Sequence, residues 1–230
     1  MAAQLIRFKH PGKTYANGET GLYNMTNSGN SALSSFPKPP GATDDTWADH
    51  LYGGKQYCTA NPLASVQTVH TVSFWFYALL NWQDNPNDPI FAPGGNIPNG
   101  NFLVWVFPQP NGRFQVSHAF QSGVFCTDFV RSNQAWNHWI GVFHGGYIAT
   151  SCLTAYKDGV KGINYSYGGG FVAPSMNATT LTYGGAALYS RYVTEYVWDM
   201  RMWDYELSDA ECRAVYRGYF NQGQGTAQVV

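Results

Sequence analysis

The strongest pattern in the chain is an alternation of hydrophobic and polar positions in "HTVSFWFYAL", residues 70–79. A side-chain period of two places successive residues on opposite faces of an extended chain, so this run predicts a β-strand. The two faces carry Val72, Phe74, Phe76 and Ala78 on one side, and Thr71, Ser73, Trp75 and Tyr77 on the other. We expect either Phe74 and Phe76 or Trp75 and Tyr77 to be buried between two sheets.

Further short runs of this kind alternate with turn signals from about Trp47 onward. The run "NFLVWVFPQPNGRFQVSHAF" contains two strand-like stretches around Asn111-Gly112, and Asp158-Gly159 marks a second tight hairpin. Three more runs complete the set, namely "WNHWIGVFH", "LTYGGA" and "EYVWDMRMWD". Short strands separated by turns, without a repeat of solenoid length, favour an all-β domain.

One helix is expected near the C-terminus, in "LSDAECRAVYRGY". Ser208 and Glu211 form a capping box, in which each side chain bonds a backbone N–H group at the helix start. Leu207 before the cap and Cys212 inside the helix fit a hydrophobic staple. The pattern therefore predicts a short helix over residues 208–219 that packs on the edge of the sandwich.

Residues 1–45 differ from the rest, because Gly, Pro, Asn and Ser dominate and no period is sustained. Such a segment has little ability to bury surface within itself. We interpret it as an extended N-terminal assembly arm that contacts another chain, followed by one domain over residues 46–230. The alternative is an arm that wraps its own domain and covers a sheet edge. Its expected anchors are Leu5, Ile6, Phe8, Tyr15, Tyr23 and Phe36.

Composition and charge limit the partners. The chain has 230 residues, of which 44% are hydrophobic, 17% aromatic and only 12% charged, with a formal net charge of −1. A near-neutral chain gives no electrostatic reason to expect a nucleic acid or an anionic membrane as a partner. No run approaches the roughly 18 to 20 apolar residues of a membrane span, so membrane insertion is not expected.

The N-terminus and the cysteines bear on the cellular compartment. The opening "MAAQLIRFKHPGK" lacks a continuous apolar stretch and does not have the pattern of a signal peptide. No cysteine pair has CxxC spacing, so buried thiols are favoured over a zinc site, and their disulfide state stays open. The four cysteines are Cys58, Cys126, Cys152 and Cys212.

The order of these pieces resembles the laminin-G-like, concanavalin-A-like jelly rolls, from about Trp47 to Phe220. "TVSFWFYALLNWQDNPNDPIFAPGG" is similar to the early core strand of that family, and "AWNHWIGVFHGG" to its Trp-x-His segment. "LTAYKDGV" resembles the following Asp-Gly hairpin, and "VWDMRMWDYELSDAECRAVYRG" the terminal strand and helix. The resemblance implies an antiparallel two-sheet jelly-roll sandwich with one short C-terminal helix.

The resemblance also explains a stretch that has the composition of a reactive cluster, residues 135–162, with its tryptophans and histidines. In such a sandwich, Trp136 and Trp139 would pack in the core and at its rim, and His138 would occupy a framework position. His118 and His144 are interpreted as hydrogen-bonded or exposed histidines on strands, not as ligands of a metal.

Related jelly-roll glucanases place two carboxylates on one face of a strand, as nucleophile and acid. Here the sole candidate is "TEYVWDMRMWDYE", in which Glu195 and Asp199 share a face with Arg201. The full Glu-x-Asp-x-x-Glu arrangement of that enzyme family is absent, and Asp199 beside Arg201 predicts a surface or cross-strand ion pair. The chain is therefore not expected to be an enzyme, and glycoside hydrolase is the less favoured alternative.

Two kinds of binding site remain open. Sugars stack on exposed aromatic rings while amides hold their hydroxyls, and the aromatic candidates are Trp82, Trp105, Tyr165, Tyr167, Phe171 and Tyr189. Laminin-G-like domains often hold Ca²⁺ at the sandwich rim, and "QDNPNDP" offers the oxygen ligands Asp84, Asn85, Asn87 and Asp88. That string is also an ordinary polar turn, and no other cofactor is expected.

These observations together indicate a non-enzymatic module that acts by binding surfaces. The composition is poor in charge, as in proteins of an exterior surface, yet the N-terminus does not have the pattern of a signal peptide. A virus particle accounts for both observations, because its exterior proteins are made in the cytoplasm. We therefore favour a virion exterior protein, such as a capsid decoration or fibre component of a phage. Its partners would be other virion proteins or copies of itself, and surface glycans. The alternative is a secreted or cell-surface lectin-like module.

Overall fold

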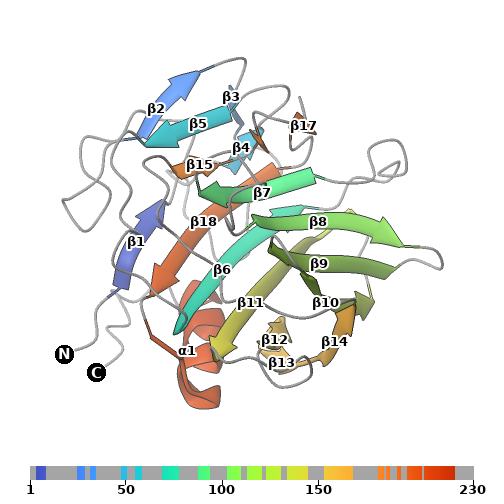
Figure 1. Cartoon of the computed structure of the whole chain (residues 1–230). Helices are drawn as coiled ribbons and strands as arrows, with labels where there is room; N and C mark the ends of the chain where they lie inside the picture. The colour runs from blue at the N-terminus through green and yellow to red at the C-terminus, as the bar shows by residue number, and fades with distance from the viewer. Residues whose placement is uncertain are drawn as a thin grey trace.

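The computed structural model of the chain contains the strands β1 to β18 and the C-terminal helix α1 (Figure 1). Side chains are described for residues 70–77, 134–144, 154–162, 198–199, 201–203 and 205–218. The described backbone comprises residues 4–8, 25–28, 32–34, 48–50, 55–58, 69–77, 88–93, 103–109, 113–120, 123–130, 134–144, 153–167, 181–183, 185–186, 191–192, 196–203 and 205–220.

Two eight-stranded antiparallel sheets form the domain, which confirms the all-β, two-sheet prediction. Sheet A has the order β13 (Val160–Lys161), β12 (Leu153–Lys157), β11 (Trp136–His144), β6 (Val69–Tyr77), β18 (Tyr196–Trp203), β4 (Ala48–His50) and β3 (Ala32–Ser34), and β1 (Gln4–Phe8) also pairs with β18. Sheet B has the order β14 (Ile163–Tyr167), β10 (Gly123–Val130), β9 (Arg113–Phe120), β8 (Leu103–Gln109), β7 (Asp88–Pro93), β15 (Leu181–Tyr183), β5 (Lys55–Cys58) and β2 (Met25–Ser28). The short strands β16 (Gly185–Ala186) and β17 (Arg191–Tyr192) pair with each other.

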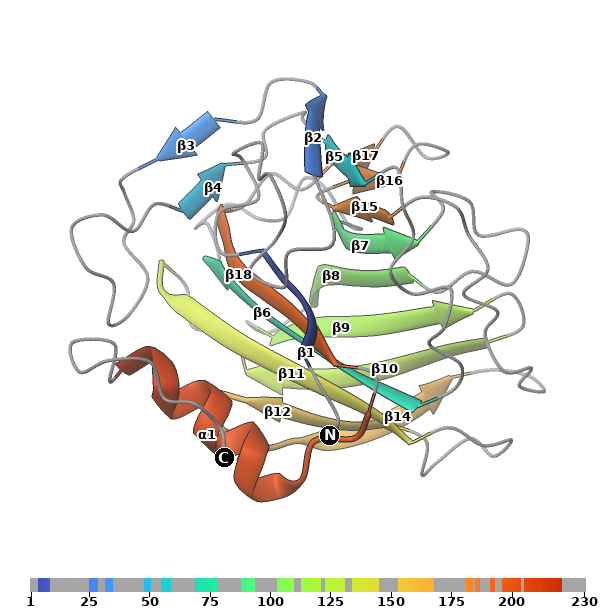
Figure 2. The same cartoon turned by 90° about the vertical axis from the view of Figure 1, so that its left-hand side faces the viewer.

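The helix α1 (Asp209–Phe220) lies against sheet A on the face turned away from sheet B (Figure 2). We call this face of sheet A the outer face and the opposite one the inner face. The outer face carries Trp75, whose ring is stacked 5.9 Å from that of Tyr216 on α1. The inner face carries Phe74, whose ring lies 5.3 Å from that of Trp139. Sheet A is therefore the middle layer of three.

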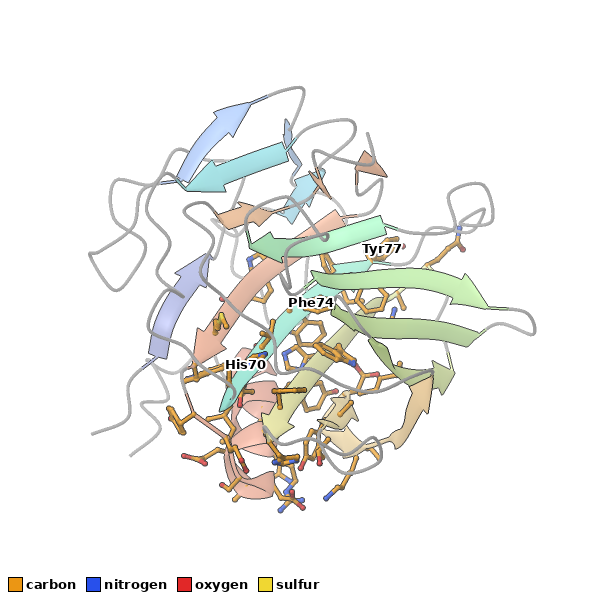
Figure 3. All side chains as sticks on the ribbon, viewed as in Figure 1. His70, Phe74 and Tyr77 are labelled. Carbon is orange, nitrogen blue, oxygen red and sulfur yellow. The ribbon has the colours of Figure 1, made fainter. Side chains whose placement is uncertain are left out.

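The strand β6 is buried on both faces, because it lies in this middle layer. Phe74 and Phe76 are on the inner face, as the first of the two sequence alternatives requires, and Trp75 is equally buried under the helix. The polar residue Thr71 is also fully buried on the outer face. Its hydroxyl donates to the carbonyl of Tyr205 at 2.8 Å and accepts from the N–H of Leu207 at 3.1 Å. Figure 3 shows the course of β6 from His70 through Phe74 to Tyr77.

The segment with tryptophans and histidines is framework, as the resemblance implies. On β11, the indole of Trp139 covers Gly141 so closely that a Cβ at position 141 would lie 2.2 Å from Cη2 of the ring. Glycine is therefore required for this close approach. The hairpin at Asp158-Gly159 is confirmed, because both residues have positive φ, 51° and 77°. The N–H of His138 donates to Oδ1 of Asp158 at 2.8 Å, which ties this turn to β11.

The helix starts as its capping box predicts. The N–H of Ser208 donates to Oε2 of Glu211 at 2.7 Å, and the N–H of Glu211 donates to Oγ of Ser208 at 3.3 Å. Leu207 and Cys212 are both buried in the core cluster between α1 and sheet A, in the positions of a hydrophobic staple. A cap of this kind contributes about 1 kcal/mol to helix stability. The sequence placed both helix ends to within one residue.

Three segments of the expected N-terminal arm are strands that pair with their own chain. β1 pairs with β18, β2 with β5 and β3 with β4. This is the geometry that the wrapping alternative predicts for these segments. The division of the chain into an arm over residues 1–45 and a domain over 46–230 stays a prediction, as does an assembly role.

Deleting residues 2–8 is expected to destabilise the fold, because it uncovers the edge of β18 that β1 covers. A loss on the order of 2 kcal/mol corresponds to about 4 to 8 °C in Tm for a chain of this size. Differential scanning fluorimetry and light scattering measure the Tm and the aggregation. Arg7→Ala, which retains the strand backbone, serves as the control. An unchanged Tm and a monodisperse truncated chain would show that β1 adds nothing to the fold.

Candidate functional site

A stack of aromatic rings lies beneath α1 on the outer face of sheet A. The imidazole of His138 lies 4.7 Å from the ring of Trp75 and 5.7 Å from that of Tyr216, measured between centroids. His138 is completely buried. Because no part of its ring meets solvent, this histidine serves packing and does not present a ligand to the exterior.

The carboxylate of Asp199 is also completely buried, at a β-bulge of β18. The bulge places Asp199 at φ 47°, and the Nη2 of Arg201 donates to its Oδ2 at 3.0 Å while Nε donates to Oδ1 at 3.3 Å. The prediction of a surface or cross-strand ion pair is wrong in its location. The extra residue of the bulge turns the carboxylate toward a neighbour on the same strand, so the pair is internal to β18.

Burial sets the charge state of two histidines in sheet A. It lowers the pKa of His70, whose ring stacks on Phe143 at 5.1 Å, to about 3. Burial is also the main cause that lowers the pKa of His138 to about 3, with the nearby charge of Arg201 adding to it and Asp199 opposing it. Both side chains are therefore neutral at physiological pH.

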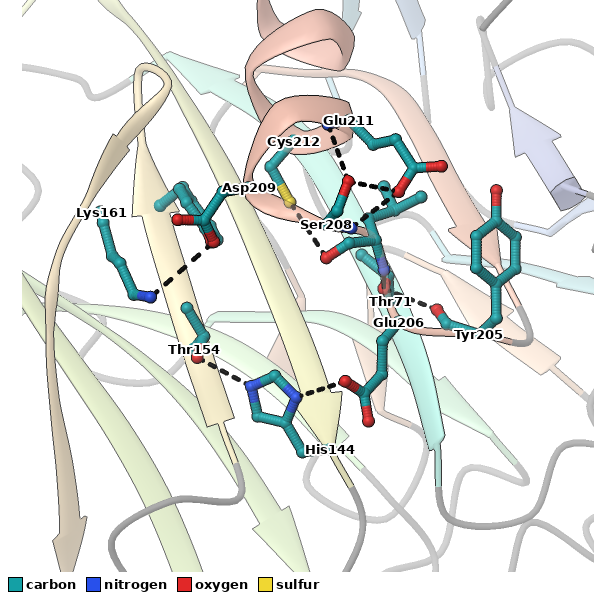
Figure 4. Close-up of polar contacts among 12 residues, drawn as sticks. Thr71, His144, Thr154, Lys161, Tyr205, Glu206, Ser208, Asp209, Glu211 and Cys212 are labelled. Atoms are coloured by element: carbon teal, nitrogen blue, oxygen red, sulfur yellow. Dashed lines mark hydrogen bonds and ion pairs between the residues drawn. The ribbon is translucent and has the colours of Figure 1, made fainter. Parts of the chain in front are cut away.

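A polar contact fastens the linker before α1 to the edge of sheet A (Figure 4). The ring of His144 contacts Oε2 of Glu206 through Nδ1 and Oγ1 of Thr154 through Nε2, both at 2.8 Å. The expectation that His144 is a hydrogen-bonded strand histidine is thus confirmed. With Thr71, which bonds the backbone on both sides of Glu206, this contact fixes the direction in which the chain enters the helix.

The start of α1 carries a second polar contact with the sheet. The hydroxyl of Tyr156 donates to Oδ1 of Asp209, and Nζ of Lys161 lies 3.8 Å from the same oxygen. The hydrogen bond from Tyr156 is the main cause of a lowered pKa at Asp209. Burial raises the pKa of the Cys212 thiol to about 12, so this free cysteine is a packing residue and not a nucleophile.

The register of sheet B brings together three of the aromatic candidates. Tyr165 on β14 pairs with Cys126 on β10, which pairs with Ser117 on β9, which pairs with Trp105 on β8. Residues directly opposite each other share a face of a sheet, so Trp105 and Tyr165 lie on the same face. Tyr167 lies two positions after Tyr165 on β14 and shares that face too.

The sequence pattern distinguishes the two faces of sheet B. The face opposite to Trp105 carries the apolar residues Val104, Val106, Phe114, Val116, Phe120, Phe125 and Phe129. The Trp105 face is mixed, because it carries the polar residues Gln115 and Asp128, which pair with each other across β9 and β10, and also apolar residues, which are Leu103, Phe107, Val124 and Val130. This pattern predicts that the apolar face packs toward sheet A and that the Trp105 face meets solvent.

Trp105, Tyr165 and Tyr167 are placed by the backbone register alone, and the other predicted site residues also lie outside the residues whose side chains are described. Asp88 begins β7, and Leu5, Ile6 and Phe8 lie in β1. Outside the described backbone are Trp82, Phe171 and Tyr189, the calcium candidates Asp84, Asn85 and Asn87, and the arm residues Tyr15, Tyr23 and Phe36. The calcium site and the anchoring role of the arm stay predictions. The part of the chain that is described contains no metal-ligating group of three or more side chains and no helix suited to span a membrane.

Sequence reasoning missed the linker contacts of Glu206 and the bulge at Asp199. Glu206 and its partner His144 are 62 positions apart in the sequence, and no local pattern connects them. The bulge had a weak signal, because "VWDMRMW" interrupts a regular alternation with a charged residue on each side of a methionine.

The three layers, with two antiparallel sheets and one terminal helix, are those of a jelly-roll sandwich domain. A family model described as Laminin_G_3, Concanavalin A-like lectin/glucanases superfamily, matches residues 52–213. The chain therefore belongs to the concanavalin A-like lectin/glucanase superfamily. No curated protein sequence matches it.

Solved structures with the same fold include a domain of an arabinanase and the receptor binding domain of a neurotoxin. Domain 4 of AbnA, a GH43 extracellular arabinanase from Geobacillus stearothermophilus solved with arabinotriose, is similar with a TM-score of 0.64 and 13% identity, covering 94% of this chain and 98% of that one. The receptor binding domain of botulinum neurotoxin D has a TM-score of 0.63 and 14% identity, covering 94% of this chain and 52% of that one. At these identities the likeness shows the fold.

Acidification is expected to destabilise the protein through its two buried histidines. The unfolded chain takes up a proton at each with a pKa of 6.5, whereas in the folded chain the pKa of both is about 3. The free energy of unfolding therefore falls as the pH drops below about 6.5, by about 2 kcal/mol per histidine between pH 7 and pH 5. Urea denaturation at several pH values measures the slope.

Variants test whether the two histidines cause the dependence of the free energy of unfolding on pH. His70→Gln and His138→Gln are expected to be less stable at pH 7 yet to depend less on pH. Ser73→Ala, at a buried position that does not titrate, should keep the wild-type slope. Equal slopes in the histidine variants and the wild type would contradict the assignment.

Proposed function

We propose that this domain is a non-enzymatic carbohydrate-binding module whose ligand lies across sheet B. The observation that carries the proposal is the row Trp105, Ser117, Cys126 and Tyr165, which register places on one face. Two aromatic residues stand at its ends and two small residues between them. Three strand-to-strand steps of about 4.8 Å separate the ends by about 14 Å.

This spacing suits an oligosaccharide better than a compact ligand. Aromatic rings offer an apolar surface on which a sugar ring stacks, and the small residues leave room for the chain between the two rings. Gln115 and Asp128 lie in a neighbouring row on the same face, where amide and carboxylate groups are suited to hold hydroxyls. The solved complex of the arabinanase domain with arabinotriose supports a sugar ligand for this fold.

The burial of Asp199 supports binding without hydrolysis. The acid pair considered from the sequence was Glu195 and Asp199, and Asp199 has no exposed surface and is held by Arg201. A carboxylate in that position cannot contact a glycosidic bond. Glu195 lies outside the described residues.

Binding without turnover is the expected outcome of a direct assay. Isothermal titration calorimetry with arabinotriose, cellotriose and xylotriose should detect binding of at least one of these sugars, and chromatography should detect no shortened products. Trp105→Ala and Tyr165→Ala are expected to weaken binding by about tenfold, which is 1.4 kcal/mol. Asp199→Asn should affect stability alone, because it breaks a buried ion pair.

A matched aromatic control separates a binding surface from a general loss of packing. Tyr205→Ala removes a half-buried aromatic ring next to sheet A, far from the proposed row in the fold. It should leave affinity unchanged. Product formation that Asp199→Asn abolishes would make the chain a hydrolase, and equal affinity in all four variants would move the binding site away from sheet B.

We further propose that the module is displayed on the exterior of a virion, with a secreted or cell-surface location as the alternative. The support is compositional: 12% charged residues and 17% aromatic residues suit a surface that contacts other surfaces. Peptides of the chain should then co-purify with intact virus particles through a density gradient and be detected by mass spectrometry. Recovery from the particle-free medium instead would favour the secreted alternative.

A further inference from the structure

A chain of hydrogen bonds at the edge of sheet A joins a hydroxyl, an imidazole and a carboxylate (Figure 4). Nε2 of His144 lies 2.8 Å from Oγ1 of Thr154, and Nδ1 of the same ring lies 2.8 Å from Oε2 of Glu206. A hydroxyl is activated as a nucleophile when a base lies within hydrogen-bond reach and a third group orients that base. The three side chains therefore have the arrangement of an activated hydroxyl group.

The fold holds each of the three groups in place. Thr154 on β12 pairs with Val142 on β11, so His144, two positions further along β11, is its diagonal neighbour on the same face of the sheet. Thr71 bonds the backbone of the residues on both sides of Glu206. The carboxylate is therefore held beside the ring by backbone contacts as well as by its own hydrogen bond.

The carboxylate sets the direction of both hydrogen bonds. An ionised carboxylate accepts hydrogen bonds and cannot donate them, so Nδ1 of His144 carries the hydrogen that is donated to Glu206. In the neutral imidazole Nε2 is then the acceptor, and the hydroxyl of Thr154 donates to it. The basic nitrogen thus lies where it can take the proton of the hydroxyl.

Solvent reaches this group of side chains. The side chain of His144 is 31% exposed and that of Glu206 is 42% exposed, while Thr154 is half-buried. Two other histidines of sheet A, His70 and His138, are completely buried. A small reagent can therefore approach the hydroxyl and the base of this group, which it cannot do at the two buried histidines.

We propose that Thr154 is a covalent modification site whose hydroxyl takes an acyl group from an activated ester. Oγ1 forms a bond to the acyl carbon, and the bond from that carbon to the leaving oxygen breaks. The proton of the hydroxyl passes through Nε2 of His144 to the leaving oxygen. The acyl oxygen develops its negative charge in water, which stabilises that charge less than fixed donors do, so the step suits a donor with a good leaving group.

The modification has a consequence for the helix. An acylated Thr154 can no longer donate to His144, so acylation loosens the contact that fastens the linker before α1 to the sheet. The step occurs once per chain and is not turnover, so it agrees with a domain that acts by binding. It is also independent of the sugar-binding proposal, because it concerns the edge of sheet A and not sheet B.

Acetylation with p-nitrophenyl acetate tests the site in the full-length chain. We expect a rapid release of about one p-nitrophenol per chain, as in the formation of an acyl intermediate. Peptide mass spectrometry should place the acetyl group on Thr154, and hydroxylamine should remove it, which separates an ester from an acetylated amine at the neighbouring Lys157. Ser208 is the internal control, because its exposed hydroxyl donates to the carboxylate of Glu211 and not to an imidazole. It should stay unmodified.

Variants assign the reaction to the three groups. Thr154→Val and His144→Gln should each slow the rapid release by about a hundredfold, and Glu206→Gln should slow it less, while Thr154→Ser should retain it. Circular dichroism and Tm confirm that each variant is folded. Unchanged release in Thr154→Val would show that the imidazole itself attacks the ester and would overturn the proposal. Equal acetylation of Thr154 in His144→Gln and in the wild type would overturn it too, because the hydroxyl would then react without its base.

Discussion

The structure depends on the burial of both faces of β6. Burying an aromatic or large aliphatic side chain contributes about 1.5 to 3 kcal/mol, and β6 places Phe74 and Phe76 on one face and Trp75 on the other. A sheet facing solvent with such a surface would be unstable and prone to associate. Two coverings are therefore required, sheet B on the inner face and α1 on the outer face.

Because α1 covers the outer face of sheet A, polar residues are buried on that face. A helix that follows a strand must turn back over the sheet, and the linker between them exposes backbone groups that need partners. Thr71 supplies them for Tyr205 and Leu207, and the capping box of Ser208 supplies them at the helix start. Contacts of His144 and Tyr156 hold the same region from the sheet edge. The polar side chains that alternate with apolar ones along the strands are thus used to fix the helix.

The sequence predicted the elements whose signals are local. The alternation in β6, the Asp158-Gly159 hairpin and the capping box of α1 each depend on residues within a few positions of one another, and the structure confirms all three. It did not predict that both faces of β6 are covered, because Thr71 and Ser73 make one face polar in a pattern typical of a solvated strand. It also misplaced the Asp199–Arg201 pair, since a bulge changes the facing of residues without changing their order. The candidate site was predictable only as a set of aromatics, and the placement of Trp105 and Tyr165 at the two ends of one row across sheet B required the register.

The same layering restricts where the module can bind. On the outer face of sheet A, α1 covers the rows of Thr71 and Trp75, and the inner face is core. Among the described residues, sheet A therefore offers a ligand no open face, and the sequence pattern leaves the Trp105 face of sheet B as the candidate surface. The Trp105 row lies on strands β8 to β14 of sheet B, so it is separate from the covered faces of sheet A.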